Sequence, residues 1–492
     1  MLLSKSGYIA GLQCPRRLWL QKNGGEEFIS EQSHKLTTLG HEVGEAALLL
    51  LGTPVKVEQA RPLEMVKKTE SLISASTPLI AEAAFLFEGC YCQADILKVV
   101  GNKDVEVYEV KSTTKIEPYH LEDIAFQYYV ISHTGYNVRK FYHLHLNKDY
   151  LGITGKIDAE ALFEKTDVTE DILRMQKDVP EKIQKCKTYM SRAYMEPCNL
   201  GTFCKKPTEC EFIKHCCKEH GCEDNSRSVQ NIQGMFWRDK ANLINAGVSD
   251  FESYRKSGVQ PKFSMQVDYE LEDKGLFVNK SRVNDFLHSL SYPLYNLDYE
   301  SIQQDVPLYD GVRPYQQVPF QYSLHIMGAP NKELLHKEFL AEEGKDPRRA
   351  LAEKLCSDIP YGACVLAYNA SFEKSITKEL SNQFPDLAGH LTSFDFKDLM
   401  IPFKNKDVYC KEMQGSYSIK YVLPALFPNE PSLDYHNLED VQNGTMAMDA
   451  YRSLPALPPS ERAHLRNRLL RYCELDTYAM VCVLRKLYEF VQ

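Results

Sequence analysis

The chain has 492 residues and a formal net charge of −9, with 58 Lys and Arg against 67 Asp and Glu. This length allows two or three domains, and a composition of 43% hydrophobic and 25% charged residues is typical of globular rather than disordered proteins. The negative charge argues against a protein that coats nucleic acid non-specifically, so a polyanionic partner needs a local basic groove or bound cations.

The chain separates into three regions that differ in their pattern of helix-like and strand-like segments. Residues 1–222 mix helical and strand patterns, residues 223–290 are helical and polar, and residues 291–492 alternate strands with helices. We therefore expect an α/β (α+β) protein with two domains joined by a helical segment. No run of eighteen apolar residues occurs and the beginning of the chain lacks a signal-peptide pattern, so we expect a cytoplasmic protein without a membrane partner.

The first acidic cluster comes from a predicted hairpin, in which ADILKVV and VEVYEVK flank the turn GNKD. Side chains alternate along a strand, so Glu109 and Lys111 point the same way, and antiparallel pairing brings Asp95 close to them. Two carboxylates and a lysine that converge can bind a divalent cation and position a water molecule beside it. The alternative is an ordinary exposed Glu/Lys alternation.

These residues resemble the RecB-like branch of the PD-(D/E)xK nucleases over about the first 220 residues. QADIL supplies the motif aspartate, Asp95, and YEVK supplies Glu109 and Lys111. AFQYY supplies a helix glutamine, Gln127, near the site. The resemblance implies a restriction-endonuclease-like fold, a catalytic role for these four residues, and Mg²⁺ or Mn²⁺ as the cofactor.

The remaining metal ligand of this family is commonly a histidine on the first helix, which LGHEVGEAALLL resembles. Gly44 occupies the expected position, with His41 three residues earlier and Glu45 next to it. Positions 41 and 45 share a helical face, so we expect one of the two to replace the missing ligand. Glu82 in IAEAAF is another candidate.

Six of the fifteen cysteines lie within residues 198–222. Clustered thiols in a reducing compartment are more often metal ligands than disulfides. The even spacing of Cys204, Cys210 and Cys216 differs from the paired short knuckles of a zinc ribbon and leaves a four-ligand site one thiolate short. Cys14 in GLQCPRR can supply the fourth.

This arrangement resembles the iron–sulfur subgroup of RecB-like nucleases, in which one cysteine before the nuclease core joins three after it. The resemblance implies a [4Fe–4S] cluster on Cys14, Cys204, Cys210 and Cys216, with Cys198 as the substitute ligand. Zinc stays open as the alternative, because four thiolates suit both by ligand count. Either group would close a very long loop and so restrict the unfolded chain.

The region 223–290 contains NIQGMFWRDKANLINAGVSDFESYRKSG, which has the pattern of a helix, a glycine turn and a second helix. It is similar to helix-hairpin-helix segments, which present backbone N–H groups to a DNA phosphate. A helical spacer between two domains is the simpler interpretation.

The second acidic cluster comes from three separate elements. PLYNLDYE, VPFQYSLHIM and LHKEFLA predict three successive strands, and the first of them carries Asp298 and Glu300 on one face. Glu373 follows the strand ACVLAYN at the start of a helix, and Tyr472 and Asp476 share a face of the long final helix. Separate acidic elements beside a tyrosine suit phosphodiester cleavage with two metal ions. Taken singly, each is more often a solvated carboxylate or a packed aromatic.

The set resembles the DnaQ-like (DEDD) 3′→5′ exonucleases, which have an RNase H-like fold, over about residues 290–492. Asp298 and Glu300 match the first motif, and Glu373 matches the second, where aspartate is usual. Asp476 matches the last motif. The resemblance makes Tyr472 the residue that orients the attacking water.

The fourth acid of this family has no sure match. Asp449 is favoured, because it lies on a predicted helix shortly before the Tyr472 helix, and Asp395 and Asp398 compete with it. Glu373 is one methylene longer than aspartate, which moves the carboxylate by about 1.5 Å.

Together the resemblances imply a metal-dependent nuclease with two active sites that hydrolyses DNA, most simply as an exonuclease on single strands or free ends. DNA end processing, repair and defence against foreign DNA are consistent roles. The pairing is similar to a family of bacterial proteins whose C-terminal half is labelled a domain of unknown function. The alternatives are a nucleic-acid-binding scaffold with one or both sites inactive, and a zinc-stapled nuclease that acts on RNA.

Overall fold

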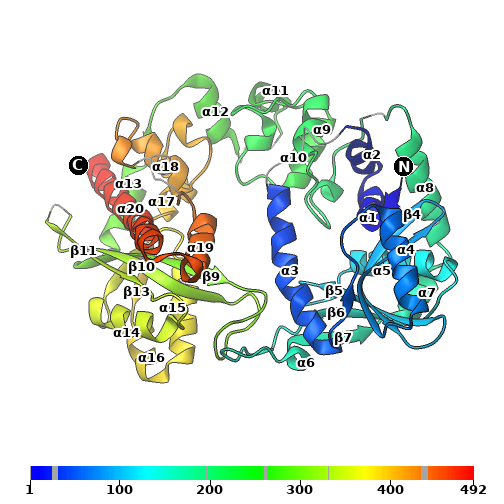
Figure 1. Ribbon diagram of the computed structural model, residues 1–492. Coiled ribbons are helices and arrows are strands. Elements are labelled where there is room, and N and C mark those ends of the chain that lie inside the picture. Colours follow the sequence, from blue (N-terminus) through cyan, green and yellow to red (C-terminus); the bar gives the residue numbers. More distant parts are fainter. Residues whose placement is uncertain (1, 25–31, 196, 260–262, 331, 434–440) are drawn as a thin grey trace. The chain divides into compact units, whose positions relative to one another are not determined.

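The computed structural model of the chain consists of two compact units (Figure 1). It describes residues 2–24, 32–195, 197–259, 263–330, 332–433 and 441–492, with residues 32–41 described by their backbone alone. Unit 1 comprises Met1–Gln230, Met235–Asp250 and Gln304–Tyr315, and unit 2 comprises Asn231–Gly234, Phe251–Gln303 and Gln316–Gln492. Both units combine helices with a sheet, which confirms the expected α/β fold class.

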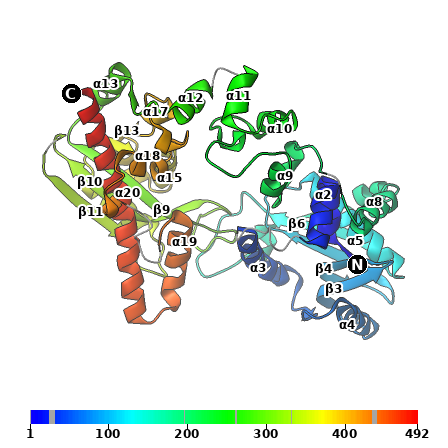
Figure 2. The same ribbon diagram turned by 90° about the horizontal axis from the view of Figure 1, so that it is seen from above.

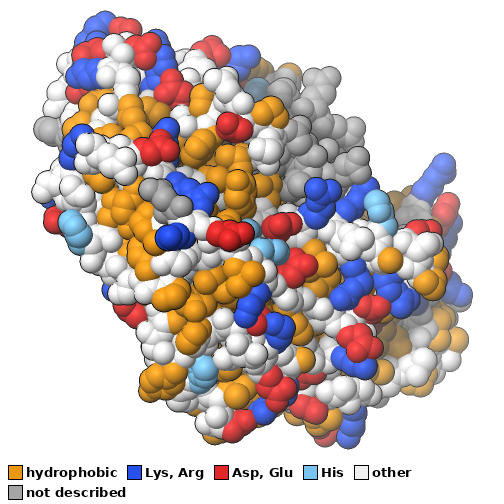
Figure 3. All heavy atoms as spheres, turned by 90° about the vertical axis from the view of Figure 1, so that its left-hand side faces the viewer, with side chains coloured by type: hydrophobic (Ala, Val, Ile, Leu, Met, Phe, Trp, Pro, Cys, Tyr) orange, Lys and Arg blue, Asp and Glu red, His pale blue; other side chains and the backbone are white. Residues whose placement is uncertain are grey.

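None of the described helices is both long enough and apolar enough to cross a lipid bilayer. Figure 3 shows one face of the molecule, on which charged side chains of both signs interrupt the hydrophobic ones.

Unit 1 is built on a mixed sheet with the strand order β2-β3-β4-β5-β6-β7 (Figure 2). Strand β1 lies parallel to β4, the strands β3, β4 and β5 are antiparallel neighbours, and β5 and β6 are parallel. The predicted hairpin is therefore confirmed as β4–β5. The strands are β1 (Leu3–Ser4), β2 (Val55–Lys56), β3 (Leu79–Phe87), β4 (Cys90–Val99), β5 (Asp104–Lys111), β6 (Asn137–Leu146) and β7 (Phe163–Asp167).

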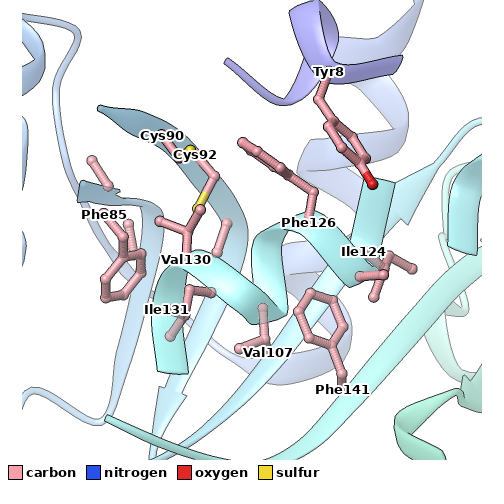
Figure 4. Close-up of a cluster of buried hydrophobic side chains, with 14 of the residues drawn as sticks. Tyr8, Phe85, Cys90, Cys92, Val107, Ile124, Phe126, Val130, Ile131 and Phe141 are labelled. Carbon is pink, nitrogen blue, oxygen red and sulfur yellow. The ribbon is translucent and has the colours of Figure 1, made fainter. Parts of the chain in front are cut away.

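Helix α5 (Pro118–His133) connects the parallel strands β5 and β6 and is the most buried helix of this core. It begins with a proline, which suits a first turn because the N–H groups there have no partner within the helix. Figure 4 shows its side chains, among them Phe126 and Ile131, packed against Val107 of β5 and neighbouring strands. Phe126 also stacks on Tyr8, with 4.7 Å between ring centroids.

The other helices of unit 1 surround this core. They are α1 (Lys5–Gln13), α2 (Pro15–Asn23), α3 (Gln32–Leu51), α4 (Pro62–Ser74), α6 (Ala159–Leu162), α7 (Thr169–Met175), α8 (Val179–Ser191), α9 (Ile213–Glu219) and α10 (Trp237–Asn245).

Unit 2 is built on a sheet with the order β11-β10-β9-β12-β13. The strands β9, β10 and β11 are antiparallel neighbours, which confirms the three predicted successive strands, and β12 and β13 continue parallel to β9. The strands are β9 (Leu294–Gln303), β10 (Gln317–Met327), β11 (Leu334–Leu340), β12 (Cys364–Ala367) and β13 (Asp395–Asp398), and β8 (Phe277–Val278) pairs with β14 (Val408–Tyr409) apart from this sheet.

The alternation of residues along β9 gives the sheet of unit 2 two different faces. Leu297 and Tyr299 pack in a core with helices α14 (Arg348–Asp358) and α15 (Ser371–Gln383). Asp298 points the other way, where Cys473 of helix α20 (Pro459–Val491) lies 3.8 Å from its Oδ2 atom. Figure 1 shows α20 on one side of the sheet and α14 and α15 on the other.

Unit 2 has further helices besides α14, α15 and α20. They are α11 (Phe251–Ser257), α12 (Ser264–Glu272), α13 (Lys280–His288), α16 (Pro385–Leu391), α17 (Ile401–Lys404), α18 (Ile419–Leu426) and α19 (Gly444–Ser453).

Candidate active sites and a cysteine cluster

The first acidic cluster lies where β4 and β5 run side by side. Ile96 pairs with Tyr108, so the next residues along the ladder, Asp95 and Glu109, are neighbours. The backbone N–H of Val110 donates to Asp95 Oδ2 at 2.7 Å, and Lys111 Nζ donates to Glu109 Oε1 at 2.7 Å. The structure thus brings together the three residues expected from the strand pattern.

Helix α5 adds two polar side chains to this cluster. Gln127 Nε2 donates to Glu109 Oε2 at 2.9 Å, as expected for a helix glutamine near the site. Asp123 accepts from Lys111 Nζ at 2.8 Å and was not identified from the sequence. Asp123 and Gln127 are four residues apart and therefore share a helical face, which is the sequence signal that could have identified Asp123.

A second lysine, Lys5, also enters the cluster. Its Nζ atom donates to Glu109 Oε1 at 3.0 Å and lies 3.6 Å from Asp95 Oδ1. Lys5 begins α1, directly after the short strand β1 that pairs with β4. No local pattern in the sequence indicates this contact, because it depends on a pairing between segments about 90 residues apart.

A pocket of about 280 Å³ opens beside these residues. Asp95 and Lys111 line it together with Glu45 of α3 and Glu82 of β3, two candidates for the remaining ligand. The side chain of His41, the other candidate on α3, lies outside the described residues, and Gly44 lines the pocket without offering a ligand.

Glu82 has an unusual backbone conformation for this role. Its φ angle is +58°, and the β3–β4 pairing is interrupted at Glu82 and the facing Asp95 without a change of register, since Ala81 pairs with Ile96 and Ala83 with Ala94. A non-glycine residue held in the left-handed region costs about 1–3 kcal/mol, and such strained residues cluster at active sites and ligand-binding positions. Of the described candidates, Glu82 therefore has the strongest structural signature of a ligand.

The charges of the first site balance within the protein. Burial, aided by the charge of Glu109, raises the pKa of Asp95 to about 7. Burial also opposes ionisation of Glu109, but Lys111 and Lys5 outweigh it and hold the pKa of this carboxyl well below its usual value. The acidic partners in turn keep the pKa values of both lysines raised in spite of burial. A cation bound between Asp95 and Glu109 would therefore compete with Lys5.

The second acidic cluster joins β9 to α20. One carboxylate oxygen from each of Asp298, Glu300 and Asp476 lies within 4.8 Å of the others. These three residues and Tyr472 line a pocket of about 430 Å³. The structure brings together the strand pair and the helix pair that the sequence predicted.

Glu373 joins this cluster from the first turn of α15 and is 3% exposed. Its Oε2 atom is buried without a hydrogen-bond partner. Its charge contributes to raising the pKa values of Asp298 and Glu300, so it lies close to both. An ionisable oxygen buried without a partner is costly, and a bound cation would remove that cost.

The three candidates for the fourth acid lie in different places. Asp398 is close enough to Glu373 to raise its pKa, and it accepts from the backbone N–H of Asn369 at 2.9 Å. Asp449 is exposed on α19 and does not line the pocket, although residues of the same helix do. Asp395 is exposed and forms an ion pair with Lys397 at 3.2 Å.

The charges of the second site do not balance. Burial and the charge of Asp476 raise the pKa of Glu300 to about 8, and burial with the charge of Asp398 raises that of Glu373 to about 8. Burial and the surrounding carboxylates also raise the pKa of Asp298 and keep the Tyr472 hydroxyl protonated. Buried carboxylates with little cationic compensation fit one or two divalent cations.

The cysteines expected to bind a cluster lie together. Cys14, Cys204, Cys210 and Cys216 are all buried, and the charge of Cys14 affects the pKa values of the other three. Cys198 is also close, with its Sγ atom 3.8 Å from that of Cys14.

The cysteine sulfur atoms of the described residues form no group of three within 4.8 Å of one another. Within the described residues two groups of three metal-binding side chains lie within 4.8 Å of one another, and neither contains a cysteine. A zinc ion with bonds of about 2.3 Å would hold its thiolates about 3.8 Å apart. The separation of 3.8 Å between the Sγ atoms of Cys14 and Cys198 equals this distance, so the sulfur geometry agrees with zinc as well as with an iron–sulfur cluster.

Polar contacts hold α1 and α2 against the cysteine-rich segment. Gln13 Nε2 donates to the backbone oxygens of Phe203 at 2.6 Å and Thr208 at 2.8 Å. Arg17 Nε donates to Glu211 Oε2 at 2.9 Å. Cys14 thus reaches the other thiols through contacts that close a loop of about 190 residues.

Comparison with protein families gives one match, to a domain of unknown function (DUF2779), over residues 295–418. The matched region includes Asp298, Glu300 and Glu373 and ends before Tyr472 and Asp476. The comparison with curated proteins found no match.

Proposed function

We propose that the protein is a metal-dependent nuclease that hydrolyses DNA phosphodiester bonds in two separate active sites. The observation that carries the proposal is the convergence of Asp298, Glu300, Glu373 and Asp476 beside Tyr472, with a buried oxygen of Glu373 left unpartnered. The strand order of unit 2, in which two parallel strands follow three antiparallel ones, supports an RNase H-like domain. The β5-α5-β6 crossover beside the β4–β5 hairpin supports a restriction-endonuclease-like domain.

In the second site Asp298, Glu300 and Asp476 would hold Mg²⁺ or Mn²⁺, with Glu373 as a further ligand. When bound, the metal supplies Lewis-acid stabilisation of the phosphate and a more acidic water. Tyr472 keeps its hydroxyl proton and lines the same pocket, so it can orient a water toward the scissile phosphate. A pocket of about 430 Å³ has the size of a small-molecule site and favours a flexible strand end over an intact duplex.

In the first site Asp95 and Glu109 would hold the metal, with Glu82 or Glu45 completing the ligand set. Lys111 lies 2.7 Å from Glu109 and lines the pocket, so its ammonium group can stabilise negative charge that develops on the phosphate. Gln127 fixes the second oxygen of Glu109.

We assign Cys14, Cys204, Cys210 and Cys216 to a [4Fe–4S] cluster. The burial of all four cysteines and the closeness of Cys14 to the other three support a shared metal group, and the resemblance to iron–sulfur nucleases favours iron over zinc. The role of the cluster would be structural, since it would join α2 to the segment around α9.

Degradation of end-labelled single-stranded DNA with Mn²⁺ tests the proposal. We expect the wild-type protein to degrade the label, Asp298→Asn to remove one activity and Lys111→Ala the other, and the double variant to be inactive. Arg349→Gln, at an exposed ion pair of unit 2, is the control and should act as wild type. Wild-type protein that degrades neither DNA nor RNA, or a double variant as active as wild type, would contradict the proposal.

A second candidate function is a nucleic-acid-binding scaffold in which the first site is inactive. The observation that favours it is Lys5, whose ammonium group contacts Glu109 and lies near Asp95. Under this alternative Asp298→Asn alone would abolish all degradation, whereas Lys111→Ala would leave it unchanged.

A further inference from the structure

We propose that unit 2 binds one transition-metal ion of the zinc class through His325, His336 and Glu474, a site that its nuclease function does not require. One ligand atom from each of these residues lies within 4.8 Å of the others. Two imidazoles and one carboxylate form the ligand set of zinc sites with a water as fourth ligand, whereas Mg²⁺ prefers oxygen ligands alone.

The backbone brings the two histidines together. His325 on β10 and His336 on β11 are paired directly across the antiparallel ladder, and their ring centroids are 4.5 Å apart. Glu474 approaches from α20, with its Oε1 atom 3.8 Å from His336 Nδ1. Three elements of unit 2 therefore converge on one point.

Each histidine has one ring nitrogen engaged by a hydroxyl group. The hydroxyl of Thr477 lies 2.8 Å from His325 Nδ1, and that of Ser323 lies 2.9 Å from His336 Nε2. The two hydroxyls are themselves 2.7 Å apart and are buried. Metal-binding histidines almost always have their second nitrogen fixed in this way, because the contact sets the tautomer and the ring orientation. The remaining nitrogens, Nε2 of His325 and Nδ1 of His336, are left for the metal.

The site is accessible to an ion. His325 is 4% exposed, but the side chains of His336 and Glu474 are 24% and 48% exposed, so the ligands extend from the interior to the surface.

A metal bound here would fasten α20 to the sheet next to the acidic pocket. Glu474 lies between Tyr472 and Asp476 in the helix, and Ser323 pairs across the ladder with Asp298. Fixing these positions would hold Asp476 over Asp298. The ion would therefore have a structural role, and its binding would raise the stability of unit 2.

Cobalt(II) is the probe that tests the site, because its visible absorption distinguishes nitrogen and oxygen ligands from thiolates. Metal-free full-length protein would be titrated with Co²⁺ by absorption and equilibrium dialysis, and with Zn²⁺ by thermal unfolding. We compare wild type with His336→Gln and with Glu474→Gln. The fold should tolerate the second substitution, because the side chain of Glu474 is exposed. The matched control is His464→Gln, an exposed histidine on the same helix.

We expect wild type and His464→Gln each to bind one equivalent of Co²⁺ more than His336→Gln binds. Glu474→Gln should still bind this extra equivalent, but at least about 10-fold more weakly than wild type. Thr477→Val should weaken binding by about 10- to 100-fold through the loss of the hydroxyl contact. Zn²⁺ should raise the unfolding temperature of wild type but not of His336→Gln. Asp298→Asn should keep the extra equivalent even if the protein has no nuclease activity.

Equal Co²⁺ stoichiometry in wild type, His336→Gln and Glu474→Gln would overturn the proposal. It would also be overturned if His464→Gln lost the extra equivalent of Co²⁺ as His336→Gln does, or if Asp298→Asn lost that equivalent. If His336→Gln does not fold, Glu474→Gln and Thr477→Val decide by the same titration.

Discussion

At the scale of single residues, Lys5 has the largest consequence for the first site. Its ammonium group lies 3.0 Å from Glu109 and 3.6 Å from Asp95, in the space that a cation bound by both carboxylates would need. Metal binding at this site therefore requires Lys5 to move or to lose its proton, and the acidic partners raise its pKa.

We predict that Lys5→Met strengthens Mn²⁺ binding at the first site by about 10-fold or more, since about 1.4 kcal/mol of competing ion pairing corresponds to tenfold in affinity. Titration followed by electron paramagnetic resonance of free Mn²⁺ in an Asp298→Asn background measures this site. Lys98→Met, which removes an ion pair elsewhere on β4, should leave the affinity unchanged. Unchanged affinity in Lys5→Met would show that Lys5 does not compete with the metal.

Glu300 predicts a pH dependence of stability. Its pKa in the folded protein is raised to about 8, against about 4.3 in an unfolded chain, so the folded state binds more protons between these values. The stabilisation is complete below about pH 4.3 and is lost as the pH rises through about 8. In EDTA we expect the free energy of unfolding to fall from pH 5 to pH 8 in wild type and to fall less in Glu300→Gln, by about 1–3 kcal/mol.

Urea denaturation at both pH values measures this difference. Glu353→Gln, an exposed residue paired with Arg349, is the control and should follow wild type. A wild-type protein whose stability falls over this range no more than that of Glu300→Gln would contradict the assignment.

Some site residues could be predicted and others could not, for a physical reason. The period-two alternation of β5 and β9 placed Glu109 with Lys111 and Asp298 with Glu300, because such spacing is a local property of a strand. Lys5 enters the first site only because β1 pairs with β4, which no short-range pattern indicates. Asp398, one of three candidates for the fourth acid, is similar, since its closeness to Glu373 depends on the parallel pairing of β13 with β12.

At the scale of elements, α1 and α2 link the cysteines to the first active site. Helix α1 begins with Lys5, and Cys14 lies between α1 and α2. The same short segment thus supplies a residue of the acidic cluster and a ligand of the proposed iron–sulfur cluster.

We predict that loss of the cluster loosens this segment. Cys204→Ser should abolish the visible absorption of anaerobically purified protein and increase the hydrogen exchange of α1 and α2 by at least about 10-fold, since the cross-link that restrains them is removed. Mass spectrometry of peptides from Lys5–Asn23 measures the exchange. Cys482→Ser, a partly exposed cysteine of α20, should behave as wild type. Unchanged exchange in Cys204→Ser would contradict a stapling role.

The order of the elements was more predictable than their contacts. The hairpin, the three successive strands of unit 2 and the long final helix followed from alternation, turn residues and helical periodicity. The left-handed backbone conformation of Glu82 did not, because IAEAAF is apolar enough to predict a regular strand. A strained backbone is set by the surrounding structure and leaves no local pattern.

At the scale of the whole molecule, the two units are interleaved in sequence. Residues Gln304–Tyr315 lie between β9 and β10 of unit 2 but belong to unit 1. Val306 is 6% exposed in a core that includes Val43 and Tyr108. The sequence predicted regions bounded at 222 and 290 from changes in the pattern of helix-like and strand-like segments. Such changes cannot reveal a short segment that packs in a core about 200 residues away.

We predict that Val306→Ala lowers the stability of unit 1 by about 1–3 kcal/mol, the cost of a small cavity in a packed core. Leu308→Ala is the matched control from the same segment, because Leu308 is 51% exposed. Chemical denaturation followed by the absorption of the proposed iron–sulfur cluster reports on unit 1. Equal midpoints for Val306→Ala and wild type would show that the segment does not contribute to this core.

The central claim is that the chain contains two separate pockets that bind divalent metal ions. Anomalous scattering from crystals soaked in Mn²⁺ tests it most directly. We predict one or two peaks among Asp298, Glu300 and Asp476, and one peak beside Asp95 that is stronger in Lys5→Met. An absence of Mn²⁺ from either pocket, in wild type and in Lys5→Met, would contradict the account.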